Sequence, residues 1–178
     1  MNNKLNILLK QGKKLFHTQH LALLWGISNR NTLLTAITRY VRQGILFRVH
    51  KGFYSVLPLE HIEPVELGAG ALHEYAYLST ETVLTRQGIL QQHIHHITFV
   101  SSVSRTLKIK NFQYKVRKLN DGFLFNGTGI IALNGIKIAS TERAVADLLY
   151  YYPHYYFDNN RKVDWKKVRQ FQKEIGYL

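Results

Sequence analysis

Apolar residues in the first third of the chain recur with the spacing of short amphipathic helices. Leucines at i, i+3 and i+4 predict a helix over residues 5–11 that ends at Gly12, and residues 13–16 predict a brief strand. The same spacing predicts a second helix, which we expect Thr18 to cap and Gly26 to end. The chain therefore starts with helix, short strand and helix.

A third helix and a hairpin follow. The helix is expected to start at Ser28, its N-cap, and to run to about Gln43. Alternating residues on both sides of the turn at Lys51 and Gly52 predict two paired strands, at 47–50 and 53–57. The inward face of the helix is the apolar stripe Leu33, Leu34, Ile37, Tyr40 and Val41.

The rest of the chain mixes both kinds of pattern. Alternation and short apolar runs predict strands at 96–101, 107–109 and 114–116, and Asn134-Gly135 is the strongest hairpin signal in the chain, between 130–133 and 136–139. Three more helices are expected: Ser79 to Gln87, Ser140 or Thr141 to Pro153, and a last one that Asp164 caps, with Val168, Phe171 and Ile175 inward.

A change in composition between Pro58 and Pro64 indicates two domains. The first, residues 1–58, has the element order of a winged helix-turn-helix. The second, residues 65–178, is expected to be a mixed α/β domain with antiparallel strands and flanking helices. The predicted fold class is therefore α+β.

Positive charge is concentrated in the first domain. The chain has a formal net charge of +13, and residues 1–59 hold nine Lys or Arg and no Asp or Glu. The remaining residues hold fifteen basic and eleven acidic side chains. A segment this basic favours a polyanionic partner such as nucleic acid. Two later basic runs, 105–118 and 161–173, are interpreted as solvated faces.

The third helix has the side-chain chemistry to read bases in a DNA groove. At 100° per residue, its outward face carries Asn31, Thr32, Thr35, Thr38, Arg39 and Arg42 and no acid. Asn and Arg form bidentate pairs with adenine and guanine, and threonine methyls contact the thymine methyl. We expect the first three of these residues to enter the groove deepest and Arg42 to meet a phosphate.

Further contacts are expected at the helix start and the hairpin tip. Ser28 and the free amides beside it would form an anion site, and Arg30 would swing toward the DNA backbone. The hairpin tip would act as a basic wing. The candidate DNA-binding residues are therefore Ser28, Asn29, Arg30, Asn31, Thr32, Thr35, Arg39, Arg42, Arg48, His50 and Lys51.

Two stretches of the first domain carry a resemblance to a known family: Leu24-Trp25-Gly26-Ile27-Ser28-Asn29-Arg30-Asn31-Thr32 and residues 40–54. They resemble the N-terminal domain of AbiEi-type abortive-infection antitoxins, with Lys51, Gly52, Phe53 and Tyr54 matching the family's wing. The helix from Ser140 to Leu148 is similar to a Glu-Arg and Asp-Leu helix in the family's second domain. The resemblance implies a regulator that represses its own operon in a phage-defence toxin-antitoxin system. It also implies a nearby nucleotidyltransferase-type toxin, whose neutralisation need not involve direct contact between the two proteins.

Catalytic and metal chemistry find little support. The chain has no cysteine, which excludes disulfides, zinc ribbons and thiol nucleophiles and fits a reducing cytosol. His93, His95 and His96 form the one dense histidine group, but no acid or cysteine lies near enough in the sequence to complete a metal site. Glu142 and Asp147 are five apart on one helix and point in different directions. We expect no enzyme activity, cofactor or metal.

These two acids are given structural roles instead. Glu142 fits the positive end of its helix, and Asp147 is expected to hold the two domains together or to fix the loop before Pro153.

The expected partner is an operator in double-stranded DNA, and the expected location is the cytoplasm, associated with the nucleoid, with no membrane partner. The aromatic tract Tyr150–Phe157 has more rings than a core can take and is a candidate surface for self-association or another partner. Two alternatives stay open. The second domain could neutralise a toxin by direct binding, or the protein could bind RNA or DNA without sequence preference.

Overall fold

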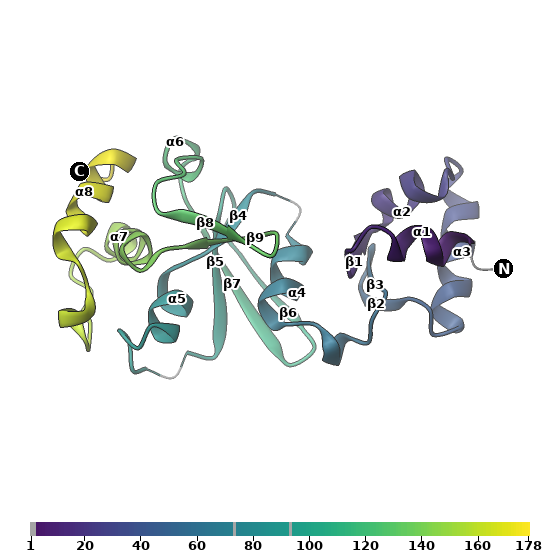
Figure 1. Cartoon of the computed structure of the whole chain (residues 1–178), viewed down its shortest axis with the longest axis horizontal. Coiled ribbons are helices and arrows are strands. Elements are labelled where there is room, and N and C mark those ends of the chain that lie inside the picture. The colour runs from purple at the N-terminus through teal and green to yellow at the C-terminus, as the bar shows by residue number, and fades with distance from the viewer. Residues whose placement is uncertain (1–2, 73, 93) are drawn as a thin grey trace. The chain divides into compact units, whose positions relative to one another are not determined.

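The structure of the chain is a computed structural model that describes residues 3–72, 74–92 and 94–178. It has mixed α and β structure with two sheets, and the chain divides into two compact units, residues 1–71 (unit 1) and 72–178 (unit 2). Each unit is formed by one continuous stretch of the chain, which the colours of Figure 1 trace from the N-terminus to the C-terminus. No helix in the described part of the chain is both long and apolar enough to cross a bilayer.

Unit 1 contains the predicted succession of helix, short strand, helix, turn, helix and hairpin (Figure 1). Its sheet has the order β1-β3-β2, with antiparallel pairing throughout. The elements are α1 (Asn3–Leu9), β1 (Leu15–His17), α2 (Thr18–Trp25), α3 (Arg30–Arg42), β2 (Phe47–His50), β3 (Phe53–Ser55), a 3-10 turn at Leu59–His61 and α4 (Pro64–Ala71).

One hydrophobic core holds α1, α2 and α3 against the sheet of unit 1. Contributions come from α1, β1, α2, α3 and β3, so that α3 is anchored along its whole inner face. Trp25 packs on Tyr40 with ring centroids 5.4 Å apart. The buried members are Leu8, Phe16, Leu21, Trp25, Leu33, Ala36, Ile37, Tyr40, Leu46 and Tyr54.

The structure corrects three details of these helices. The side chain of Asn29, rather than Ser28, caps α3, and it accepts a hydrogen bond from the Thr32 amide at 3.0 Å. Thr18 is the first residue of α2, and the N-cap position belongs to His17. Leu34 is 39% exposed and lies outside the apolar stripe. Neighbouring residues with similar propensities can each fit a cap, and the backbone conformation decides between them.

The division between the units falls after Ala71 rather than between Pro58 and Pro64, because α4 packs on β1. The His17 ring bonds to the Gly70 carbonyl at 2.8 Å, and Lys14 pairs with Glu66 at 2.7 Å. A methyl group on Gly70 would lie 2.8 Å from a Leu15 side-chain carbon, so glycine permits this close approach.

Unit 2 is built on a six-stranded sheet in the order β6-β7-β5-β4-β9-β8. Helix α7 contacts both α5 and α8 (Figure 1). The strands are β4 (Ala76–Leu78), β5 (His96–Ser101), β6 (Arg105–Ile109), β7 (Phe112–Lys118), β8 (Ile130–Leu133) and β9 (Ile136–Ala139). The helices are α5 (Thr80–Arg86), α6 (Asp121–Leu124), α7 (Thr141–Tyr151), a 3-10 turn at Asn160–Lys162 and α8 (Trp165–Ile175).

The sheet of unit 2 is mixed, which corrects the expectation of antiparallel strands. Three pairs are antiparallel, but β4 lies parallel to β9 and β5 parallel to β7. Both parallel pairs join strands that are not consecutive in the chain. The sequence analysis missed them because turn residues predict only the pairing of consecutive strands. The predicted hairpin at Asn134 and Gly135 is present, with positive φ at both residues.

All three helix starts predicted for unit 2 are confirmed, and two of the three predicted capping bonds are present. Ser140 caps α7 by accepting from the Arg143 amide at 3.2 Å, and Asp164 caps α8 by accepting from the Lys167 amide at 3.0 Å. Ser79 stands at the start of α5, but its hydroxyl makes no capping bond there. It donates instead to Asp147, at 2.6 Å.

Candidate nucleic-acid interface

Helix α3 presents one polar and basic face. The residues expected to face outward are exposed, and the opposite side is buried in the core of unit 1. This alternation follows from the 3.6-residue period, because residues three and four apart lie on one side of the helix. The exposed set is Asn31, Thr32, Thr35, Thr38, Arg39 and Arg42, and the buried set is Leu33, Ala36, Ile37 and Tyr40.

The start of α3 is built by Asn29 and Thr32. The Asn29 carboxamide oxygen accepts from the Thr32 hydroxyl at 3.2 Å as well as from its amide. Both side chains are therefore engaged in shaping the first turn. Ser28 is exposed and does not cap the helix, so its expected capping role is wrong, while the anion site expected beside it stays a prediction.

Five basic side chains lie on α3 and the hairpin between β2 and β3. Arg39 lies 5.7 Å from the centroid of the Tyr40 ring, which supports its guanidinium from one side. Within the described residues no ion pair involves Arg30, Arg39, Arg42, Arg48 or Lys51. Their charges are thus available to an external anion.

The hairpin between β2 and β3 carries the other predicted residues. Arg48 and Lys51 are exposed, whereas His50 is half-buried, with its ring 5.2 Å from that of Phe53 and its Nδ1 3.0 Å from the Lys51 carbonyl oxygen. His50 therefore shapes the hairpin more than it extends from it. The Thr18 amide and hydroxyl both donate to the Gly52 carbonyl, so the tip is tied to the start of α2.

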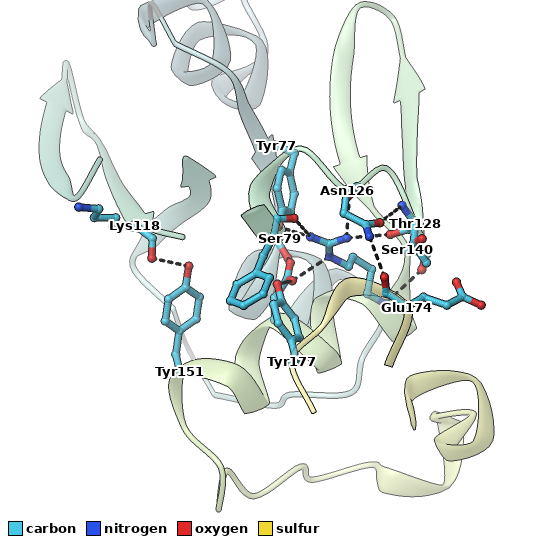
Figure 2. A network of polar contacts seen from close by, with 12 residues as sticks. Tyr77, Ser79, Lys118, Asn126, Thr128, Ser140, Tyr151, Glu174 and Tyr177 are labelled. Atoms are coloured by element: carbon cyan, nitrogen blue, oxygen red, sulfur yellow. Dashed lines mark hydrogen bonds and ion pairs between the residues drawn. The ribbon is translucent and has the colours of Figure 1, made fainter. Parts of the chain in front are cut away.

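Unit 2 contains a buried polar network that the sequence analysis missed (Figure 2). Arg143 of α7 is fully buried and donates to Asp147 at 2.8 Å, one helical turn away. Asp147 also accepts from Ser79 and Tyr177, each at 2.6 Å. The Arg143 guanidinium further donates to the Tyr77 hydroxyl and to the carbonyls of Asn126 and Thr128, all within 3.0 Å.

This network joins β4, α7, the loop before β8 and the C-terminal residues. Burial opposes the charge of Arg143, but Asp147 and the neighbouring hydroxyls outweigh it, so the pKa of Arg143 is raised. Burial and the charge of Asp147 raise the pKa of Tyr177, which keeps its hydroxyl protonated as a donor. Each charged group is thus committed to the fold, and we assign the network a structural role.

Asp147 was expected to bridge the domains or to fix the loop before Pro153. That expectation is wrong, because its partners Ser79, Arg143 and Tyr177 all lie in unit 2 and none of them lies in that loop. Glu142 lies in the first turn of α7, where its carboxylate is 3.6 Å from the Lys167 amine. The Arg-Asp spacing of four residues on an apolar face was the signal that could have revealed the network.

A second buried pair joins Glu81 of α5 to Arg117 of β7. Arg117 also donates to the Tyr152 hydroxyl at 3.1 Å. Burial works against the charge of Glu81, but its hydrogen bonds and the charge of Arg117 outweigh this effect and lower the pKa of Glu81. The pair fixes α5 and the end of α7 on the sheet.

The histidine group gives no metal centre in the described part of the chain, where no cluster of three His, Cys, Asp or Glu could hold an ion. His93 lies outside the described residues. Burial, together with the nearby charges of Lys115 and Arg117, lowers the pKa of His96.

The aromatic tract divides between inside and outside. Phe157 is buried and the Tyr151 hydroxyl donates to the Lys118 carbonyl at 2.9 Å, as seen in Figure 2. Tyr150, Tyr152 and Tyr156 are exposed, the last by 75%. The tract therefore contributes both to the core of unit 2 and to its surface.

Comparisons with known proteins add no assignment. No model of a known protein family matches the chain, and no curated protein shows significant similarity to it. The candidate site is therefore interpreted from its own geometry.

Proposed function

We propose that unit 1 is a winged helix-turn-helix that binds double-stranded DNA, and that the protein is a sequence-specific transcriptional regulator. The observation that carries this proposal is the exposed face of α3, which combines amide, hydroxyl and guanidinium groups with no acid. These groups match the hydrogen-bonding edges of bases in the major groove. In this proposal α3 enters the groove, and the β2–β3 hairpin is the wing.

We propose different roles for the exposed side chains of this interface. Asn31, Thr35 and Arg39 are assigned to base edges, since their side chains are exposed and carry the polar groups that pair with bases. Arg42, Arg48 and Lys51 are assigned to phosphates, because cations at the margins of such an interface position the protein without reading sequence. Asn29 and Thr32 shape the start of the helix.

A binding measurement with the DNA upstream of the protein's own gene tests this function. We expect tighter binding to that region than to a scrambled duplex of equal length, and repression of a reporter placed behind it. With about five phosphate contacts, log affinity should fall with log salt at a slope of about −4 to −5. Equal affinity for both duplexes at every salt concentration would contradict the proposal.

The resemblance to AbiEi-type antitoxins leads us to propose the operon of a toxin-antitoxin system as the regulated target. Direct capture of a toxin by unit 2 is a second candidate function, which the exposed Tyr152 and Tyr156 favour, because tyrosine is enriched at protein interfaces. Co-purification with the neighbouring gene product, lost in a Tyr152→Ala/Tyr156→Ala variant, would support capture. Rescue of cells from the toxin without a detectable complex would contradict it.

A further inference from the structure

Helix α8 carries three basic residues on one side, which we call the α8 basic face: Lys166, Arg169 and Lys173. At 100° per residue they fall within about 60° of one another around the helix. All three are exposed, and Gln170 lies beside them. The run was interpreted from the sequence as a solvated face, but the structure shows that its charges are gathered on one side.

The opposite side of α8 fixes this orientation. Val168 and Ile175 are buried, and Phe171 lies over Gly129, where an added methyl group would come within 2.6 Å of the ring. Helix α8 also contacts α7. The helix therefore cannot rotate to redistribute its charges without unpacking its apolar side.

The charges of the α8 basic face are not neutralised within the fold. None of the three forms an ion pair with another described residue, whereas Lys167 on the flank lies 3.6 Å from Glu142. The carboxylate of Glu174 accepts from the Gln170 amide at 2.8 Å. The face thus presents three free cations and a partly engaged amide.

An aromatic side chain stands at the start of this face. Trp165 is 39% exposed, its indole donates to the Asn160 carbonyl at 3.1 Å, and its ring packs edge-on against Phe157 at 5.7 Å. The indole is therefore held in place and still presents part of its surface.

The shape of the face favours a duplex over a membrane. Seven residues of helix span about 10 Å, a length over which duplex DNA presents about six phosphate charges. A helix that lies in a lipid interface needs an exposed apolar face, and the apolar face of α8 is buried in unit 2. A linear array of phosphates is thus the partner that fits.

We propose that the α8 basic face is a second contact surface for nucleic acid, which binds the phosphate backbone without reading sequence. This inference rests on the proposed function only in taking duplex DNA as the ligand, and it adds a surface in unit 2 that is separate from α3. It gives a role to the positive charges of Lys166, Arg169 and Lys173, which the recognition of a DNA sequence by unit 1 does not require.

A salt titration with the full chain tests the proposal. In a Lys166→Ala/Arg169→Ala/Lys173→Ala variant, the slope of log affinity against log salt should become shallower by about 2 to 3, at about 0.9 per lost phosphate contact. Affinity should fall by the same factor on the upstream region and on random duplex. Because alanine favours helices and these sites are exposed, the variant should fold, which circular dichroism checks.

The matched control removes three exposed basic residues elsewhere in unit 2, in an Arg86→Ala/Lys108→Ala/Lys118→Ala variant. An unchanged slope in the α8 variant, or an equal change in this control, would overturn the proposal. The proposal would also be overturned if the α8 variant lost binding to phosphatidylserine vesicles but bound duplex DNA as tightly as the wild type. If wild-type protein shows no preference for its upstream region but the α8 variant still has the shallower slope, the proposed regulator fails and this surface stands.

Discussion

Arg143 is a buried charged residue that connects several elements of unit 2. Its guanidinium is fully buried and bonds to groups from β4, α7 and the loop before β8. Removing one partner of a buried ion pair leaves the other charge without compensation. Loss of the Arg143 side chain is therefore expected to destabilise unit 2 by leaving the Asp147 carboxylate buried without a cation. This cost is larger than the net contribution of the ion pair to the free energy of unfolding.

We expect Arg143→Ala to lower the free energy of unfolding of unit 2 by about 3–5 kcal/mol, because Asp147 would stay buried without its cation. Chemical denaturation monitored by tyrosine and tryptophan fluorescence measures the change. The exposed Arg86→Ala should change it by less than about 0.5 kcal/mol. The loss in an Arg143→Ala/Asp147→Ala variant should be smaller than the sum of the two single losses, and additivity would contradict the coupling.

The pair of Glu81 and Arg117 predicts an acid-sensitive fold. Since the pKa of Glu81 is lowered in the folded state, its contribution to stability is present above the ordinary glutamate pKa of about 4.3 and is lost as pH falls through the lower folded value. Thermal unfolding between pH 6 and pH 3 should therefore show a steeper fall in Tm for wild type than for Glu81→Gln. Parallel curves would show that this carboxylate does not titrate as described.

Single residues also mark where the sequence was informative. The exposure of Asn31, Thr35 and Arg39 follows from helical period alone, so it could be predicted. The spacing of Arg143 and Asp147 is a local signal for their pairing, but the full burial of Arg143 could not be predicted, because arginine is mostly exposed. Its other partners, the Tyr77 hydroxyl and the carbonyls of Asn126 and Thr128, lie far away in the sequence. Long-range partners of buried charges leave no local pattern.

At the scale of elements, α3 depends on its capping residue. Asn29→Ala removes the acceptor for the Thr32 amide and hydroxyl and should destabilise unit 1 by about 1 kcal/mol. Ser28→Ala should change stability by only a few tenths of a kcal/mol, since Ser28 makes no capping bond. Urea unfolding of the two variants separates them. A larger loss for Ser28→Ala than for Asn29→Ala would contradict the cap assignment.

Element types were easier to predict than their partners. The hairpin at Asn134 and Gly135 and the caps at Ser140 and Asp164 were found because each depends on a few adjacent residues. The parallel pairs of β4 with β9 and β5 with β7 depend on how non-consecutive strands assemble, which no turn residue specifies.

At the scale of the whole molecule, the distribution of charge connects both proposals. Residues 1–59 have nine basic and no acidic side chains, and the α8 basic face adds a cluster in unit 2. The basic segment 1–59 could be found by counting charges along the sequence. The α8 basic face could be found only once the structure showed which side of α8 is buried. The division after Ala71 likewise depends on contacts between α4 and β1 rather than on composition.

The ratio of affinities for the upstream region and for random duplex tests the central claim most directly. Asn31→Ala, Thr35→Ala and Arg39→Ala should each lower this ratio by roughly 5- to 100-fold, as expected when a contact to a base edge is lost. Lys51→Ala should weaken both duplexes alike and leave the ratio unchanged, and Arg86→Ala should alter neither affinity by more than a small factor. A ratio that stays at the wild-type value in all three α3 variants would contradict the claim that this face reads DNA.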